Sequence, residues 1–180
     1  MEIKRRNKNG FNKRNDGKRN ECKTLINNVA EAFRLVYKND KFLIEKGLCE
    51  RCIMFRFAHY LAGLYPDYDV DCEYNRHKGN VKKIIEEKNI FPDIIIHKRG
   101  TDSENFAVIE LKNETNISND GRKTDKTKLQ ALTKSYNNGE KDSLYNYGYK
   151  FGLAIDVCEN LQETMNSIVV YRQGEKDDKK

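Results

Sequence analysis

Apolar residues recur every three or four positions in three stretches of the chain, and this spacing predicts three amphipathic helices. The stretches cover residues 21–37, 48–64 and 123–136, with stripes formed by Leu25, Ile26, Val29, Ala32, Phe33 and Val36, by Ile53, Met54, Phe57, Leu61 and Leu64, and by Leu129, Leu132 and Tyr136. The turn residues Tyr65-Pro66-Asp67 close the second helix. A shorter helical pattern covers Val81 to Lys88.

Between these helices the period changes to two or gives way to β-branched runs, which predicts strands. Val70, Cys72 and Tyr74 alternate with polar residues, and the later strands are expected at Asp93–His97, Phe106–Lys112, Tyr147–Val157 and Thr164–Tyr171. The polar, glycine-containing segment 98–105 fits a hairpin loop between two of them. The order is helix, helix, strand, short helix, strand, strand, helix, strand, strand, which predicts one α/β domain with a mixed sheet.

The charge of the chain is concentrated at its start. Residues 1–20 hold eight basic and two acidic side chains, a net charge of +6, which equals the net charge of all 180 residues. Such a segment has little apolar surface to bury, so we expect a disordered basic arm over residues 1–20. The domain then covers residues 21–172, and residues 173–180 form a charged, flexible tail.

Composition excludes several classes of protein. No apolar run approaches the roughly 18–20 residues that a membrane helix needs, and the start does not resemble a signal peptide. We therefore expect a cytoplasmic protein without a membrane partner. The five cysteines are an odd number, which favours free thiols over a disulfide framework.

The predicted hairpin brings charged residues together. If its two strands are antiparallel and turn near residues 101–103, facing residues have numbers that add to roughly 203–205. Asp93 then lies opposite the tripeptide Glu110-Leu111-Lys112. Because side chains alternate along a strand, Asp93, Glu110 and Lys112 share one face. The other face takes the apolar residues Ile94, Ile96, Ala107, Ile109 and Leu111.

Two carboxylates so placed repel each other, and a divalent cation between them removes the conflict. The neighbouring Lys112 could then orient a water and stabilise charge on a phosphate, an arrangement typical of metal-assisted phosphodiester hydrolysis. The alternative is a solvated sheet face on which the acids pair with Lys112. The acid-any-lysine tripeptide is common in this chain, but only the copy at Glu110 lies in a β-branched run.

Glu50 lies within the apolar stripe of the second helix, beside Ile53, Met54 and Phe57. An inward-facing carboxylate is costly unless it is paired or bound to a metal. Because Glu50 is near the helix start, it could instead be a partly exposed acid favoured by the helix dipole.

These residues resemble the PD-(D/E)XK nuclease superfamily, which has the restriction-endonuclease-like fold. The matching residues are Glu50 on the preceding helix, Pro92-Asp93 at the start of one strand, and Glu110-Leu111-Lys112 in the next. The family's αβββαβ core matches positions 48 to about 157, flanked here by an extra N-terminal helix. Further segments resemble small bacterial and phage members: Cys49–Arg51, Val70–Arg76, Pro92–Gly100 and Asp125–Leu129.

The resemblance implies roles for these residues. Asp93, Glu110 and the backbone carbonyl of Leu111 would bind Mg²⁺, with Mn²⁺ as a substitute, and Lys112 would position the attacking water. Glu50 would complete the metal site or bind a second ion. Nucleic-acid contacts would come from Arg76, His97 and Lys128, although the residues alone favour a solvated Lys128 and an ordinary strand end at His97. By helical spacing, Asp125 also faces inward.

The expected function is that of a Mg²⁺-dependent nuclease, an endonuclease acting on DNA rather than RNA. The alternative is a non-catalytic nucleic-acid-binding or assembly module on the same fold. A third hypothesis is a cysteine-based zinc or redox protein, from the spacing of Cys49 and Cys52, although that spacing favours core cysteines. Many members of the fold form homodimers, but nothing in this sequence marks an interface.

Overall fold

The computed structural model describes residues 9–47, 49–77, 80–84, 88–101, 103–113, 119–134 and 147–177. The helices are α1 (Asn9–Asn39), α2 (Lys41–Glu45), α3 (Glu50–Gly63), α4 (Asn119–Thr133) and α5 (Leu161–Ser167). The strands are β1 (Asp69–Cys72), β2 (Arg76–His77), β3 (Asn80–Val81), β4 (Lys83–Ile84), β5 (Lys88–Asn89), β6 (Ile94–His97), β7 (Ala107–Asn113), β8 (Phe151–Val157), β9 (Val169–Arg172) and β10 (Glu175–Lys176).

A mixed six-stranded sheet in the order β1-β6-β7-β8-β9-β10 forms the centre of the molecule. Only β7 and β8 are parallel, and α4 provides the crossover between them; the other neighbouring strands are antiparallel. The predicted α/β class with a mixed sheet is therefore confirmed. β2 to β5 form two small hairpins inserted between β1 and β6.

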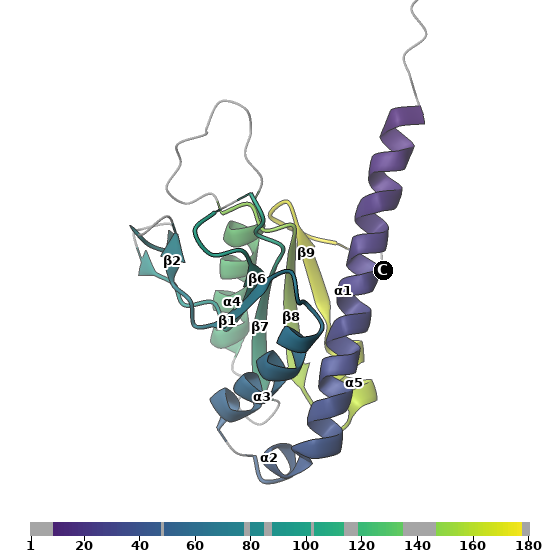
Figure 1. The fold of residues 1–180 in the computed structure, drawn as a ribbon. Helices are drawn as coiled ribbons and strands as arrows, with labels where there is room; N and C mark the ends of the chain where they lie inside the picture. Colours follow the sequence, from purple (N-terminus) through teal and green to yellow (C-terminus); the bar gives the residue numbers. More distant parts are fainter. Residues whose placement is uncertain are drawn as a thin grey trace, which may run out of the picture.

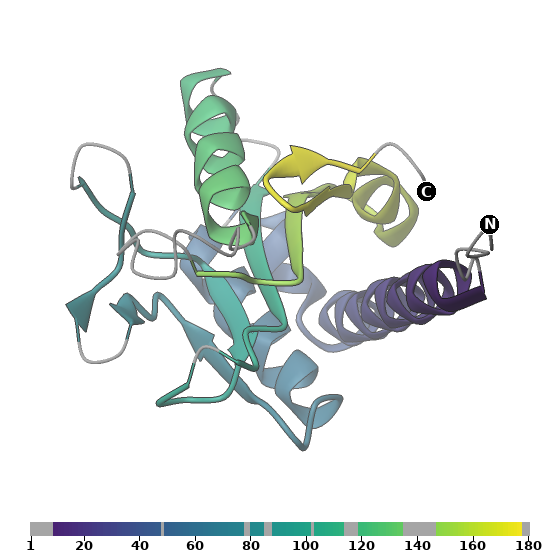
Figure 2. The same cartoon turned by 90° about the horizontal axis from the view of Figure 1, so that it is seen from above.

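Helices cover both faces of this sheet. α1 and α3 pack on one face, and α4 packs on the other (Figures 1 and 2). The predicted stripes of α1 and α3 are buried there, and they meet the β6 and β7 side chains of Ile94, Ile96, Ala107, Ile109 and Leu111. Ile95 and Val108 point to the opposite face and pack against Leu129 and Leu132 of α4. None of the helices in the described part of the chain has the length and apolar character needed to span a membrane.

Toward each end of the chain, the described residues 9–20 and 173–177 are more ordered than the sequence predicts. Residues 9–20, expected to be disordered, form the first turns of α1, whose N-terminal end runs past the sheet (Figure 1). The physical reason is cooperativity: once the packed part of α1 exists, further turns need no new nucleus. Residues 1–8 of the expected arm lie outside the described residues. At the other end, β10 pairs with β9 in the segment predicted to be flexible, and residues 178–180 are not described.

Two local predictions are wrong. The described part of the segment 81–88 contributes to short strands instead of a helix, since β3 pairs with β2 and β4 pairs with β5. Its apolar residues are too few to define a helical or a strand period, so pairing with neighbouring segments determines its secondary structure. Residues 161–167, assigned in part to a strand, form α5. Asn160 caps this helix by accepting a hydrogen bond from the Glu163 N–H at 3.0 Å, which is an N-terminal signal that the sequence analysis missed.

Candidate functional site

Asp93 and Glu110 occupy facing positions where β6 begins. The register pairs Ile94 with Ile109 and Ile95 with Val108, so the next facing pair is Asp93 with Glu110, as the sequence predicts. The Leu111 N–H donates a 2.8 Å hydrogen bond to Asp93 Oδ2, which fixes one carboxylate oxygen against β7. The strand pair therefore brings the two carboxylates together.

Glu110 is not a solvated surface acid. Only 1% of its area is exposed, because its side chain points from the middle of the sheet toward α4. One oxygen, Oε2, contacts the Lys128 ammonium. The other, Oε1, is buried and has no hydrogen-bond partner among the described residues. The alternative of a solvated sheet face is wrong for this residue.

Lys128 and Asp125 extend the cluster from α4. Lys128 Nζ lies 3.3 Å from Asp125 Oδ1 in addition to its contact with Glu110, so the solvated Lys128 that the sequence favours is wrong. Asp125 is buried, as its place in the apolar stripe predicts. Lys128 lies three residues after Asp125 and four before Leu132, and this spacing puts all three on one helix face. The helical spacing of Lys128 from Asp125 and Leu132 is the sequence signal that predicts its place in the cluster.

Lys112 and Glu50 complete the cluster at the end of β7. Lys112 Nζ lies 3.3 Å from Asp125 Oδ2 and 3.6 Å from Glu50 Oε1. Glu50 Oε2 also accepts a 3.0 Å hydrogen bond from the Asn113 N–H, so the first turn of α3 is tied to β7. Glu50 is half-buried. It is therefore both a paired carboxylate that faces the cluster and a partly exposed acid at the start of a helix, the two alternatives that the sequence leaves open.

The surroundings of Asp93 and Glu110 disfavour the charged form of their carboxylates. Burial first, and then repulsion from Asp93, raise the pKa of Glu110 well above its ordinary value. Burial also raises the pKa of Asp93, against the opposing effects of the Leu111 N–H and the two lysines. Burial alone would lower the pKa of Lys112 and of Lys128, but attraction to the surrounding acids outweighs it and raises both. The cluster therefore attracts positive charge.

The donor atoms fit a hard divalent cation. Such ions take carboxylate and carbonyl oxygens, and Mg²⁺ commonly uses one or two protein carboxylates with waters. Glu110 Oε1 supplies a buried oxygen without a partner, and Asp93 faces it across the strand pair. Within the described ranges, no three His, Cys, Asp or Glu side chains converge on a common point as metal ligands. A bound ion would therefore depend on these two acids and on water for its ligands.

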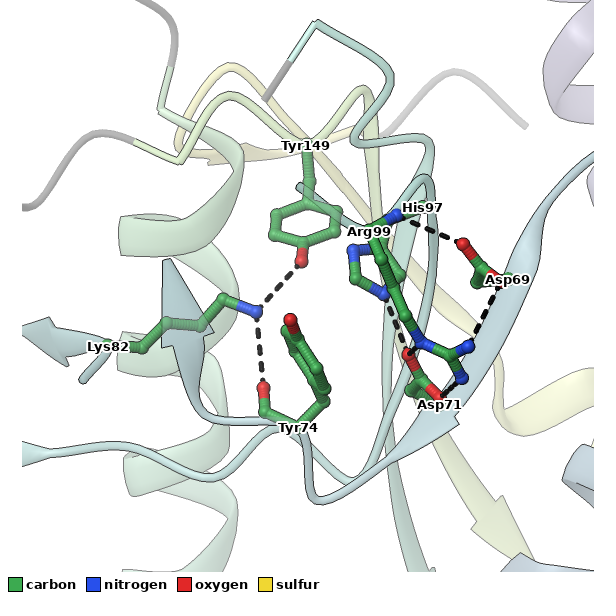
Figure 3. Close-up of polar contacts among 7 residues, drawn as sticks. All are labelled: Asp69, Asp71, Tyr74, Lys82, His97, Arg99 and Tyr149. Carbon is green, nitrogen blue, oxygen red and sulfur yellow. Dashed lines mark hydrogen bonds and ion pairs between the residues drawn. The ribbon is translucent and has the colours of Figure 1, made fainter. Parts of the chain in front are cut away.

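His97 lies at the opposite end of β6 and belongs to a different network. It is 4% exposed, and its Nε2 lies 2.9 Å from Asp71 Oδ2 (Figure 3). Arg99 binds the same carboxylate from the surface side. The Tyr74 ring packs beside His97, with 4.9 Å between the ring centroids. The structure therefore does not bring His97 into the cluster.

On the other side of Tyr74 is a buried lysine that sequence reasoning missed. Lys82 is 2% exposed, and its ammonium donates to the Tyr74 carbonyl and to the Tyr149 hydroxyl, each at 3.1 Å (Figure 3). These contacts join the segment of small hairpins to the main sheet. Nothing in the local sequence marks Lys82 as buried, because its partners are far apart along the chain.

The remaining predicted sites stay apart from the cluster. Arg76 is exposed in β2, outside the six-stranded sheet. Cys49 and Cys52, expected to be core residues, are both exposed, because the apolar stripe of α3 runs through Ile53 and Phe57 instead.

The cluster thus gathers Glu50, Asp93, Glu110 and Lys112 as the sequence analysis expects, and adds Asp125 and Lys128 from α4. The function has to be inferred from this geometry, because comparisons with protein-family models, with curated proteins and with solved structures found no match to the chain.

Proposed function

We propose that the chain is a metal-dependent nuclease that hydrolyses phosphodiester bonds, in DNA rather than RNA, on a restriction-endonuclease-like core. The element order α3-β1-β6-β7-α4-β8, with β2 to β5 as an insertion, supports this reading because it follows the expected αβββαβ order. The observation that carries the proposal is the facing pair of the half-buried Asp93 and the buried Glu110, with Lys112 near the end of β7.

In this proposal Asp93, Glu110 and the Leu111 carbonyl hold Mg²⁺ or Mn²⁺, with Glu50 as a further ligand or as the residue that orients Lys112. The ion would supply Lewis-acid polarisation of a phosphate oxygen and a more acidic bound water. The Leu111 N–H holds Asp93 in place, and the apolar residues around the strand pair exclude bulk water from Glu110.

Lys112 acts as a fixed positive charge. Its raised pKa keeps it protonated at neutral pH, so it donates hydrogen bonds and does not take a proton from water. Glu50 and Asp125 hold its ammonium near the end of β7, where Lys112 lines a pocket. There it can orient the attacking water and stabilise the charge that develops on the phosphate.

A cleavage assay tests the proposal. The full chain is incubated with plasmid and linear DNA, with Mg²⁺, with Mn²⁺ or with EDTA. We expect metal-dependent cutting that falls at least about 100-fold in Asp93→Asn and in Lys112→Met, because each removes a charge needed in the transition state. Glu159→Gln and Lys46→Met change exposed residues outside the cluster and serve as matched controls. Full activity in either cluster variant would refute the proposal.

The alternative function, a non-catalytic nucleic-acid-binding or assembly module, also has an observation in its favour. Lys128 contacts Glu110, and Lys112 contacts Asp125, so these acids already have compensating charge without a metal ion. DNA binding by the folded protein, with no cutting under any metal condition, would favour this alternative.

A further inference from the structure

A pocket of about 300 Å³ opens beside the cluster, between α4 and the strands β8 and β9. Glu110, Lys112 and Asp125 form one of its walls, so the pocket is continuous with the proposed metal site. Its volume is at the lower end of the range for small-molecule sites, which limits an occupant to a group of about nucleotide size.

The α4 side of the pocket is positively charged. Lys123 and Lys126 line it and are exposed, and neither ammonium has an ion-pair partner within the described residues. Asp156 also lines the pocket and would repel an anion, but Arg122 binds its carboxylate at 2.7 Å. Two cations therefore remain available to a ligand on this side.

The sheet side of the pocket is apolar. Ala154 of β8 and Val169 and Tyr171 of β9 form this surface, and Ala154 and Val169 are only half-buried. The Ser167 hydroxyl at the edge is bound to the backbone of Asp156, so it is already used within the protein. An occupant that suits the pocket carries negative charge toward α4 and a flat or apolar group toward the sheet.

We propose that this pocket binds the nucleotide next to the scissile phosphate in the substrate strand. Lys123 and Lys126 contact its phosphate, and Ala154, Val169 and Tyr171 take its sugar and base. The inference rests on the proposed function, because the wall shared with Glu110 and Lys112 sets the position of this nucleotide relative to the bond that is cut.

Binding measured without metal tests the pocket separately from catalysis. A fluorescein-labelled single-stranded oligonucleotide is titrated with the full chain in EDTA at several salt concentrations. The variant Lys123→Ala/Lys126→Ala should bind at least about 10-fold more weakly, with a salt slope reduced by roughly 0.7, because one phosphate is no longer neutralised. The control Lys38→Ala/Lys46→Ala removes the same charge from exposed positions outside the pocket and should bind as the wild type does.

A second variant tests the apolar side. Ala154→Leu fills the pocket without changing charge, so it should weaken oligonucleotide binding about 5-fold or more at an unchanged salt slope. Ala154→Val replaces it if the melting temperature shows that the leucine variant is unfolded. Unchanged binding by the folded Ala154 variant, or by the double-lysine variant, would overturn the proposal. The proposal would also be overturned if a mononucleotide bound in a lysine-dependent way while neither the double-lysine variant nor the Ala154 variant changed oligonucleotide binding.

The two proposals fail in different ways. If the wild type cuts DNA and the double-lysine variant binds and cuts equally well, the pocket assignment fails while the nuclease stands. If no cutting occurs but oligonucleotide binding depends on both lysines and on Ala154, the pocket stands as a strand-binding site and the nuclease fails.

Discussion

At the scale of single residues, the charges of the cluster are only partly balanced, because two lysines, Lys112 and Lys128, lie among four carboxylates. The Lys128 ammonium contacts Glu110 where a metal ion would bind, and the Lys112 ammonium contacts Asp125. The lysines offset only part of the desolvation, which still raises the pKa of Glu110 and of Asp93. In the proposed enzyme, a divalent ion would bind Glu110 in competition with the Lys128 ammonium.

This competition gives a prediction for Lys128→Met. Removing the ammonium leaves Glu110 buried without its partner, so the free energy of unfolding should fall by roughly 1–3 kcal/mol at neutral pH without metal. The loss should shrink toward pH 5, because a buried acid with a raised pKa takes up its proton in the folded state first. Chemical denaturation in EDTA, at neutral pH and at pH 5, measures the loss of stability and its pH dependence, and the same experiment is repeated with Mg²⁺.

In the same experiment, Mg²⁺ should stabilise the Lys128→Met variant more than the wild type, because its competitor has gone. Lys46→Met is the exposed control and should show neither effect. An equal response to Mg²⁺ in variant and wild type would contradict the exchange of ammonium for metal at Glu110.

His97 gives the molecule a second pH dependence, away from the cluster. Burial is the main cause that lowers its pKa, and the nearby Lys82 adds to the shift while Asp71 and Asp69 oppose it. The folded state therefore holds the neutral imidazole. Below the ordinary histidine pKa of about 6.5, the unfolded chain binds the proton first, so stability falls as the pH is lowered through that value.

Denaturant unfolding of the wild type and of His97→Gln between pH 7.5 and 5 checks this prediction. Asp71 has a lowered pKa, so its contribution is lost only at more acidic pH. The wild type should lose stability over the measured range, and the variant should lose less. Parallel curves for the two proteins would show that His97 is not the group responsible.

At the scale of elements, the close packing of α4 against β8 holds Asp125 and Lys128 over Glu110. Gly152 of β8 makes this approach possible. A Cβ atom there would lie 2.9 Å from the Thr133 methyl group and 3.3 Å from Leu129 and from Tyr171. Because Thr133 and Leu129 are themselves buried, the helix would have to move away from the sheet.

Gly152→Ala should therefore lower the free energy of unfolding by about 1–3 kcal/mol through overpacking. Gly63→Ala is the matched control, because nothing lies within 4 Å of its added methyl group at the end of α3. Alanine also has the higher helix propensity, so this control should be neutral or slightly stabilising. Thermal unfolding compares the two, and equal melting temperatures would show that α4 has room to shift.

The elements differ in how far the sequence alone predicts them. The stripes of α1 and α3 and the register of β6 with β7 could be predicted, because burial imposes a local period on Phe33, Phe57 and Val108. The small hairpins could not, since Lys82 is held by Tyr149, which lies 67 positions away. Lys128 is an intermediate case: its partner Glu110 lies 18 positions away in β7, but its helical spacing from Asp125 places it on the buried face of α4.

At the scale of the whole molecule, charge and chemistry are divided between different parts. The net charge of +6 belongs to residues 1–20, and part of that segment lies in the end of α1 that runs past the sheet (Figure 1). Glu110, Asp125 and Lys128 lie on the opposite face of the sheet, at α4. Phosphate contacts by a basic segment add affinity without sequence information, so in our proposal the start of the chain contributes to binding while the hairpin of β6 and β7 performs the reaction.

The most direct test is a crystal of the protein soaked in Mn²⁺, examined by anomalous scattering. We predict a peak between Asp93 and Glu110 at about 2.1–2.3 Å from a carboxylate oxygen of each, within reach of the Leu111 carbonyl, with Lys128 moved away from Glu110. Asp93→Asn crystals should lack the peak. A wild-type map without density for manganese at this position, in which Lys128 still contacts Glu110, would contradict the assignment of a metal-dependent nuclease.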